Sequence, residues 1–236
     1  MPFDLNKFDS ETPFLPPGFE IIGRLLVLLD DDADGSSEAL AAVIRIDAGL
    51  TADVLRISNS AAHAAASRTE TLLDAITRIG LREIYRIVTK IVTSPILSSV
   101  QQTASGRIDL WNHSLAAAEA AQFLARNTGD DPEIAFTAAL LHDLGKVMLA
   151  GSIGKEYLAL LDSCKKENQF FWEAEKQIFR IDHTDVGARL LQRWNFSPRI
   201  ASAVRYHHNP ASCHDSHRRL AALVNAGSDL PEDLRG

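Results

Sequence analysis

The sequence predicts an all-α protein. Apolar residues recur three and four positions apart in most segments, as Leu72, Ile76 and Ile79 do, and this spacing places them on one face of a helix. No segment shows a convincing alternation of apolar and polar residues, which is the pattern of a half-buried strand. Glycines, prolines and short polar runs separate the apolar segments. Together these observations predict a multi-helix bundle.

The first half of the chain holds five predicted helices. After an N-terminal arm of residues 1–13, Pro16-Pro17-Gly18 interrupts any regular element. Helices are expected at about 21–29, 40–46, 50–57, 72–79 and 84–92. Ser36 or Ser37 is expected to cap the second helix, and Gly80 to end the fourth, while the fifth is expected to end near Pro95. Residues 14–100 are therefore expected to form an N-terminal helical part.

The second half is also predicted to be helical. Its helices are expected at about 108–126, from Pro132 to near Gly151, and then at about 154–167, 170–180, 184–194, 198–207 and 217–226, with residues 210–219 forming a loop-like break. The small and polar segment Gln101–Gly106 marks the boundary between the halves. Residues 107–230 carry every histidine except His63. We expect His63 and the nearby Asn59 to have structural roles.

Composition narrows the class of protein. With 236 residues, the chain has room for one large domain or two small ones. The net charge of -7 argues against bulk nucleic-acid binding, which needs clustered lysines and arginines. No apolar run reaches membrane-spanning length, the N-terminus does not resemble a signal peptide, and two cysteines are too few for a disulfide framework. A cytoplasmic location is the expectation.

The stretch AALLHDLGKVMLA, residues 138–150, places three ionisable groups in an apolar segment. Burying an unpaired charge is costly, so such groups usually have partners or bind a metal. His142 and Asp143 lie about 100° apart on a helix and can reach one ion or two neighbouring ions. Lys146 follows one turn after His142, where it would either contact a phosphate or extend to solvent.

Further histidines lie on other predicted helices. Asp109 precedes His113 by one turn and would either ligate, orient the imidazole, or remain solvated at a helix start. His183 lies near a helix start, where it is also compatible with a capping turn. His207 and His208 end a helix and, if protonated, would suit the helix dipole. We expect His214 and His217, in the loop-like break, to be solvated.

The order of these residues is a His, then His-Asp with a Lys three positions after the Asp, then a His, then His-His. This order resembles the metal-binding pattern of the HD superfamily of all-helical metal-dependent phosphohydrolases. More closely, residues 14–226 resemble the HDOD domain, the HD-related output domain of bacterial signalling proteins. The matching stretches, in family order, are FLPPGFEIIGRLLVLLDD, LAAVIRIDAGLTADVLRISNSA, TLLDAITRIGLREIYRIV, LWNHSLAAA, AFTAALLHDLGKVMLA and DHTDVGARLLQRWNFSPRIASAVRYHHNP. This resemblance implies an HD-like helical bundle in the second half, beside an N-terminal helical subdomain.

The resemblance also implies site residues. Catalytic HD relatives place metal ligands at the positions of six residues here, and a substrate-contacting lysine at the position of Lys146. The six implied ligands are His113, His142, Asp143, His183, His207 and His208. The relatives have a further Asp in a late helix, where this chain has Ser228, with Asp229 one residue away. The Gly-Tyr-Pro segment that follows the double histidine in cyclic-di-GMP phosphodiesterases is absent from the sequence.

Two functions follow from the resemblance. The favoured one is a signalling output domain that binds a protein partner and has a retained or partly degenerate metal site. The alternative is a metal-dependent phosphohydrolase acting on a nucleotide or other phosphoester, with Asp143 at the metal and Lys146 holding phosphate oxygens. Ser228 and the small number of carboxylates, Asp143 with or without Asp109, favour one ion over two. Fe, Zn, Ni and Mn all suit histidine and carboxylate ligands.

Overall fold

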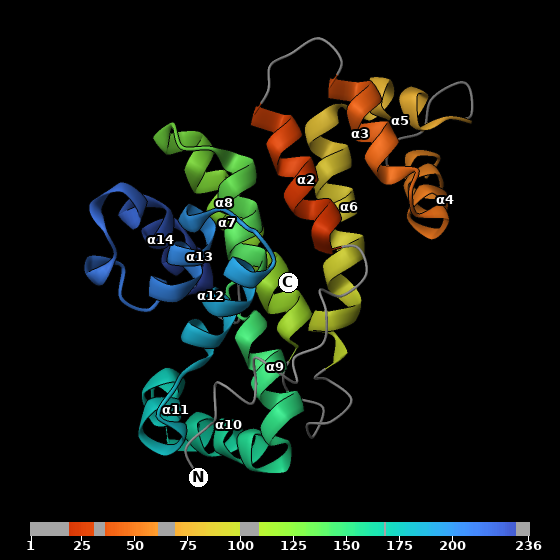
Figure 1. Ribbon diagram of the computed structural model, residues 1–236. Helices are drawn as coiled ribbons and strands as arrows, with labels where there is room; N and C mark the ends of the chain where they lie inside the picture. The colour runs from red at the N-terminus through yellow and green to blue at the C-terminus, as the bar shows by residue number, and fades with distance from the viewer. Residues whose placement is uncertain (1–18, 31–35, 61–68, 100–108, 168, 230–236) are drawn as a thin grey trace. The chain divides into compact units, whose positions relative to one another are not determined.

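The computed structural model describes residues 19–30, 36–60, 69–99, 109–167 and 169–229 (Figure 1). Within these residues the chain is helical and contains no strand, so the predicted all-α class is confirmed. The chain divides into two compact units, one within Leu15–Pro95 and one within Ile96–Gly236. The predicted boundary at Gln101–Gly106 lies outside the described residues, as does His63.

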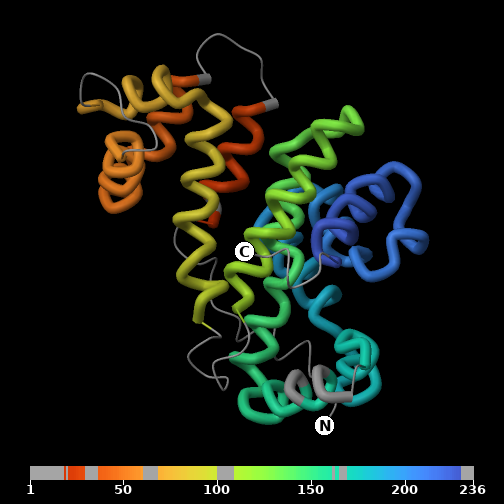
Figure 2. Tube along the Cα trace, turned by 180° about the vertical axis from the view of Figure 1, so that it is seen from behind, coloured from red at the N-terminus to blue at the C-terminus, as the bar shows by residue number. Residues whose placement is uncertain are grey.

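The first unit consists of short helices, coloured red to yellow in Figures 1 and 2. They are α2 (Phe19–Asp30), α3 (Ser36–Ile44), α4 (Ala48–Ser58), α5 (Leu72–Ile79) and α6 (Leu81–Leu97). Helix α3 packs against α2 and α5, and α4 packs against α5. Their apolar stripes form the core, which includes Ile22, Leu25 and Leu40. The five predicted helices are therefore present, with shifted ends.

Local capping groups explain where these helices begin and end. Asp47 accepts a hydrogen bond from the Leu50 amide at the start of α4, and Thr71 with Asp74 forms a capping box at the start of α5. Gly80 ends α5 with a φ of 93°, which a residue with a side chain would resist. Helix α6 includes Pro95 and ends at Leu97, two residues beyond it and close to the predicted end.

The second unit carries most of the histidines and is coloured green to blue (Figure 2). Its helices are α7 (Leu110–Thr128), α8 (Pro132–Leu140), α9 (Leu144–Ile153), α10 (Lys155–Glu167), α11 (Phe171–Phe179), α12 (His183–Arg193), α13 (Pro198–Tyr206), the 3₁₀ turn η3 (Pro210–Ser212) and α14 (Asp215–Ser228). Helix α7 packs against α8 and α14, while α12 packs against α9 and α13.

Helices α7 and α14 run antiparallel. Arg219, near the start of α14, donates to the Thr128 carbonyl and pairs with Asp130 just after the end of α7. Gly227, near the end of α14, lies so close to α7 that an added Cβ would be 2.5 Å from the Ala117 carbonyl oxygen. The C-terminal end of α14 therefore approaches the part of α7 that follows His113.

One prediction about this unit was wrong. The single helix expected from Pro132 to Gly151 is broken at residues 141–143, where two i−3 hydrogen bonds, from His142 to Ala139 and from Leu144 to Leu141, tighten the turn. Gly151 lies inside α9, and Gly154 follows the helix with a φ of 73°. The break matters for function because it takes His142 and Asp143 off a regular helix.

The region 210–219 is also more ordered than predicted. Helix α14 begins at Asp215, with His214 as its N-cap, so His217 is helical rather than part of a loop. Within the described residues, one stretch, Pro132–Ile153, is long and apolar enough to cross a membrane, but most of it is buried inside the fold. Its apolarity is that of a core segment.

Candidate metal centre

The six predicted ligands come from four places in the second unit. His113 lies in the first turns of α7, and His183 is the first residue of α12, which Asp182 caps by accepting from the Asp185 amide. His142 and Asp143 occupy the turn between α8 and α9, and the two adjacent histidines directly follow α13. The structure brings all six together: His113, His142, Asp143, His183, His207 and His208.

The first half of the cluster consists of His113, His142 and Asp143, whose donor atoms all lie within 4.8 Å of one another. The Nε2 atoms of the two histidines are 3.1 Å apart. Asp143 Oδ2 lies 3.4 Å from each of these nitrogens. His142 and Asp143 are buried, whereas 19% of the His113 side chain is exposed, so this group is reached from the His113 side.

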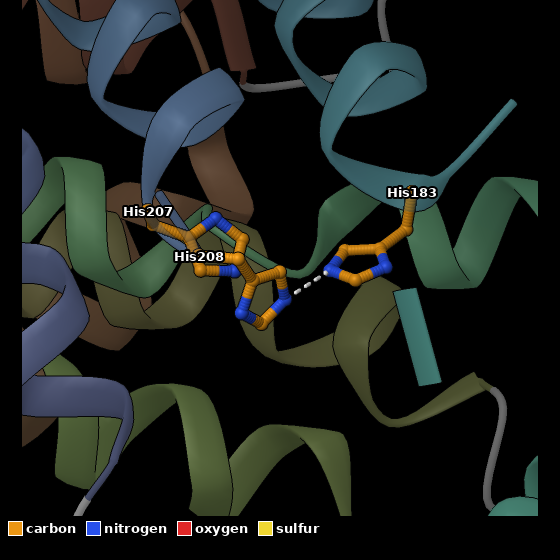
Figure 3. Close-up of side chains that lie close together, drawn as sticks. All are labelled: His183, His207 and His208. Atoms are coloured by element: carbon orange, nitrogen blue, oxygen red, sulfur yellow. Dashed lines mark hydrogen bonds between the residues drawn. The ribbon is translucent and has the colours of Figure 1, made fainter. Parts of the chain in front are cut away.

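The second half consists of His183, His207 and His208, which meet the same 4.8 Å limit. Figure 3 shows His207 and His208 extending from the same helix end, with His208 directed at His183. The Nε2 atoms of His208 and His183 are 3.1 Å apart. Asp143 Oδ1 lies 3.4 Å from His183 Nε2, so the two oxygens of Asp143 face the two halves.

Backbone carbonyls orient two of the imidazoles. His142 Nδ1 lies 2.6 Å from the Ala139 carbonyl oxygen, and His207 Nδ1 lies 2.8 Å from that of Val204. A carbonyl oxygen accepts only, so each ring carries its proton on Nδ1 and presents an unprotonated Nε2 to the cluster. This arrangement is typical of metal-ligating histidines, which are held by their second nitrogen.

The residues present fit a divalent metal ion. Two buried atoms that face the cluster, Asp143 Oδ1 and His207 Nε2, have no hydrogen-bond partner among the described residues, and an unpaired buried acceptor is costly. Two nitrogen ligands at about 2.1 Å from one ion would be about 3.0–3.4 Å apart for bond angles between square and tetrahedral. The observed Nε2 separations of 3.1 Å fall within that span.

Electrostatics favour neutral rings beside an ionised carboxylate. Burial lowers the pKa of His113 and lowers that of His207 well below its ordinary value. Burial, together with His183, lowers the pKa of His208 to about 3. Burial alone would raise the pKa of Asp143, but the neighbouring His142 and Lys146 hold it well below its ordinary value. Neutral imidazole and carboxylate are the forms that bind metal.

Lys146 lies at the edge of the cluster. Its ammonium group donates to Asp143 Oδ2 at 2.7 Å, and 17% of its side chain is exposed. Lys146 is therefore partly exposed to solvent but directs its ammonium group at the site. Its positive charge balances the buried Asp143 carboxylate. The same position would let the ammonium group contact an anion held beside Asp143.

Other polar residues considered in the sequence lie elsewhere. Asp109 is exposed and caps α7 by accepting from the Asn112 amide, so the solvated helix start is the correct interpretation and no role in orienting His113 is observed. Asp182 caps α12 and pairs with Lys176 at 2.8 Å. His214 is exposed at the start of α14. Asn59 ends α4 and binds Thr69 through its side chain, as a structural residue would.

The sequence interpretation missed Glu175. This residue is fully buried on α11, and its Oε2 lies 2.6 Å from His183 Nδ1. Tyr157 of α10 donates to Glu175 Oε1. A pattern in the sequence could have revealed it, since Glu175 lies four residues from both Phe171 and Phe179 and therefore interrupts an apolar helix face.

A cleft of about 310 Å³ adjoins the second half of the cluster at His208. Trp172 stacks on the His208 ring, and Lys176 lies over Trp172. Two ion pairs line the walls, Lys176 with Asp182 and Arg205 with Asp185. The cleft is therefore polar, carries both signs of charge, and gives a small molecule a route to His208.

Comparison with known proteins identifies similar chains. Residues 15–210 match the HDOD domain family. A protein of Treponema pallidum (strain Nichols) is 27% identical over 217 residues, which are 91% of this chain and 41% of that protein. The chain thus spans less than half the length of that relative. The crystal structure of an HDOD domain protein of unknown function from Geobacter sulfurreducens superposes with a TM-score of 0.76 at 27% identity, covering 94% of this chain and 74% of that one.

A more distant similarity involves ribonucleases. Ribonuclease Y from Cutibacterium acnes is 28% identical over 157 residues, which are 65% of this chain and 23% of that enzyme. Another similar structure, from Marinobacter aquaeolei VT8, is named for signal transduction; its TM-score is 0.77 at 24% identity, covering 96% of this chain and 50% of that one. Because the identity to the Marinobacter structure is only 24%, this similarity shows a shared fold and nothing further.

Proposed function

The chain belongs to the HDOD domain family, and we propose that it is a cytoplasmic signal-transduction output domain whose histidine cluster holds a divalent metal ion. The observation that carries this proposal is the pair of unpartnered buried acceptors, Asp143 Oδ1 and His207 Nε2, among imidazoles whose Nε2 atoms face the cluster. Its output would be contact with a protein partner rather than turnover of a substrate.

The donor set favours one ion. Asp143 is the one carboxylate among the six proposed ligands, and Lys146 already offsets its charge. Two divalent ions would bring four positive charges to a site with one negative ligand, although the two halves of the cluster provide enough donor atoms. Mixed imidazole and carboxylate ligation suits Fe, Zn, Ni or Mn. When bound, the ion would supply positive charge and Lewis acidity.

Metal analysis tests the proposal. Protein purified without a histidine tag and without added metal is expected to contain about one ion per chain by elemental analysis. His142→Ala is expected to lose that ion, whereas His217→Ala, on α14 outside the cluster, should retain it. Parent protein that stays metal-free when supplied with Fe, Zn, Ni or Mn would rule the proposal out.

Metal-dependent phosphoester hydrolysis is the second candidate. Lys146 beside Asp143 and the cleft at His208 favour it, since together they offer a cation and a route for a small phosphoester. The similarity to ribonuclease Y points in the same direction. Ser228 counts against it, because a neutral hydroxyl at the late carboxylate position removes negative charge that a second ion would need.

An activity panel separates the two candidates. Nucleoside phosphates, cyclic nucleotides, a short RNA and an aryl phosphate would be assayed with several divalent metals. An output domain is expected to turn over none of them near ordinary enzyme rates, about 1 per second or faster. Turnover at such a rate that disappears in Asp143→Ala would instead establish the phosphohydrolase.

A further inference from the structure

Glu175 is a buried carboxylate whose contacts lie inside the second unit rather than at its surface. It lies on α11 with no exposed surface, among the aromatic rings of Phe171, Tyr157 and Phe179 that surround this part of the unit. An isolated buried carboxylate would be costly. Its presence here therefore requires strong compensating contacts, and those contacts lead directly to the histidine cluster.

Both oxygens of Glu175 are hydrogen-bonded. Oε2 lies 2.6 Å from His183 Nδ1 and accepts from the His183 backbone amide at 3.1 Å. Oε1 accepts from the Tyr157 hydroxyl at 2.5 Å. Glu175 Oε2 therefore binds both the ring and the backbone amide of His183, while its other oxygen, Oε1, binds the Tyr157 hydroxyl. Burial and the Glu175 carboxylate raise the pKa of Tyr157 well above its ordinary value, which keeps the hydroxyl a donor.

The hydrogen bond with Glu175 fixes the direction of the His183 ring. With Nδ1 held by a carboxylate, the ring presents Nε2 toward Asp143 Oδ1 at 3.4 Å and toward His208 Nε2 at 3.1 Å. The Phe171 ring stacks on the His183 ring, with the two centroids 6.2 Å apart. His142 and His207 are oriented by neighbouring carbonyls of their own turns, whereas His183 depends on a residue from a separate helix.

We propose that Glu175 is a positioning residue for metal binding, that Tyr157 secures it, and that α10 and α11 are thereby coupled to occupancy of the histidine cluster. The proposal rests on the proposed metal site. A carboxylate bonded to the second nitrogen of a ligand histidine fixes the ring and increases its basicity. Linkage is reciprocal, so an ion that requires this ring orientation also stabilises the hydrogen bonds to α11 and α10.

This coupling gives the metal site a structural readout. Helix α11 contacts α12 sparsely, while α10 and α11 pack on each other. Helix α10 also packs on α9, and Phe171 and Trp172 of α11 stack on His183 and His208. The hydrogen bonds of Glu175 join α11 directly to the ring and main chain of His183. Occupancy of the site would reduce opening of this pair, and loss of the ion would increase it, which is a change that a protein partner could detect.

The test measures Zn²⁺ affinity by competition with a chelator, and hydrogen exchange of residues 155–179 with and without Zn²⁺. Glu175→Gln is expected to weaken Zn²⁺ binding roughly 10–100-fold, and Glu175→Ala more. Tyr157→Phe, which removes one hydrogen bond, is expected to weaken it about fivefold. Zn²⁺ should slow exchange in α11 of the parent, and this slowing should be largely absent from Glu175→Gln. Glu173→Gln, exposed on the same helix, is the matched control and should stay within about twofold of the parent.

Co²⁺ absorption and the melting temperature of the metal-free variants separate positioning from a purely structural role. A positioning role predicts a changed visible spectrum of bound Co²⁺ in Glu175→Gln. If Glu175→Gln lowers the metal-free melting temperature but keeps the parent's Zn²⁺ affinity and Co²⁺ spectrum, the inference is wrong and the metal site stands. If Glu175→Gln does not fold, parent-like affinity in Tyr157→Phe has the same meaning. A parent that binds neither ion overturns the inference and the proposed function together.

Discussion

Gly145 of α9 lies directly against the main chain of His183 at the start of α12. A Cβ added to Gly145 would be 1.9 Å from the His183 carbonyl oxygen and 2.9 Å from the Gly187 amide nitrogen. Only a residue without a side chain permits this approach, since both neighbours are backbone atoms that cannot rotate away. The contact holds α9, which follows Asp143, against the helix that begins with His183.

Gly145→Ala is therefore expected to destabilise the second unit by about 2 kcal/mol or more, because the two helices must move apart. The displacement of His183 should also weaken metal binding. Denaturant unfolding and metal titration measure the two effects. Gly151→Ala, in the same helix with open space around the added methyl group, is the control and should be neutral or stabilising by about 0.5–1 kcal/mol. Parent-like stability of Gly145→Ala would contradict the close packing.

Removal of the metal is expected to lower the melting temperature. A ligand at a hundred times its dissociation constant stabilises the folded state by about 2.7 kcal/mol, which is roughly 5–10 °C for a chain of this length. Calorimetry before and after chelation measures the shift. His142→Ala should melt at the same temperature with and without chelator, while His217→Ala should behave as the parent does. If chelation leaves the melting temperature of the parent protein unchanged, the protein does not hold a stabilising ion.

Ser228→Asp is expected to raise the bound metal from one ion to two. Ser228 is buried at the end of α14, directly after Gly227, which packs on Ala117 one turn beyond His113. A carboxylate there would add negative charge near the first half of the cluster. Asp229, in contrast, is exposed and accepts from Asn225. Elemental analysis checks the ratio, and Ala226→Asp, at an exposed position of the same helix, should leave it unchanged. An unchanged ratio in Ser228→Asp would mean that the late carboxylate position lies elsewhere.

The metal-free protein is expected to lose stability in acid. The pKa values of His113, His207 and His208 are lowered by burial in the folded state, so the unfolded chain binds protons first as the pH falls below about 6.5. Each such histidine contributes up to about 1.4 kcal/mol per pH unit, and for His208 the loss continues toward its folded pKa of about 3. The lowered pKa of Asp143 adds to the loss below about pH 4.

Urea unfolding of the metal-free protein at several values between pH 7.5 and 5 measures this slope. His208→Gln should make it shallower by up to one histidine's contribution, whereas His217→Gln should leave it unchanged. Stability that is constant or rises as the pH falls over this interval would show that the buried histidines do not titrate as inferred.

Much of the helical structure was predictable because its causes are local. Apolar spacing and caps act within about four residues, so α5 and its stop at Gly80 were predicted closely. The same reasoning failed at residues 141–143, where an apolar run that is compatible with a continuous helix instead turns. Periodicity cannot distinguish these outcomes, because the turn places His142 and Asp143 against groups from α7 and α12, which are distant in the sequence.

The sequence by itself determined the all-α class and the approximate helices, and its resemblance to the HDOD domain indicated the identity of the six clustered side chains. Only the tertiary structure decided that Asp143 faces both halves of the cluster, that Asp109 stays at a solvated helix start, and that Glu175 holds His183. The physical reason is that residue types and helical spacing are properties of short segments, whereas the direction of a ring or carboxylate depends on partners that packing brings from other helices.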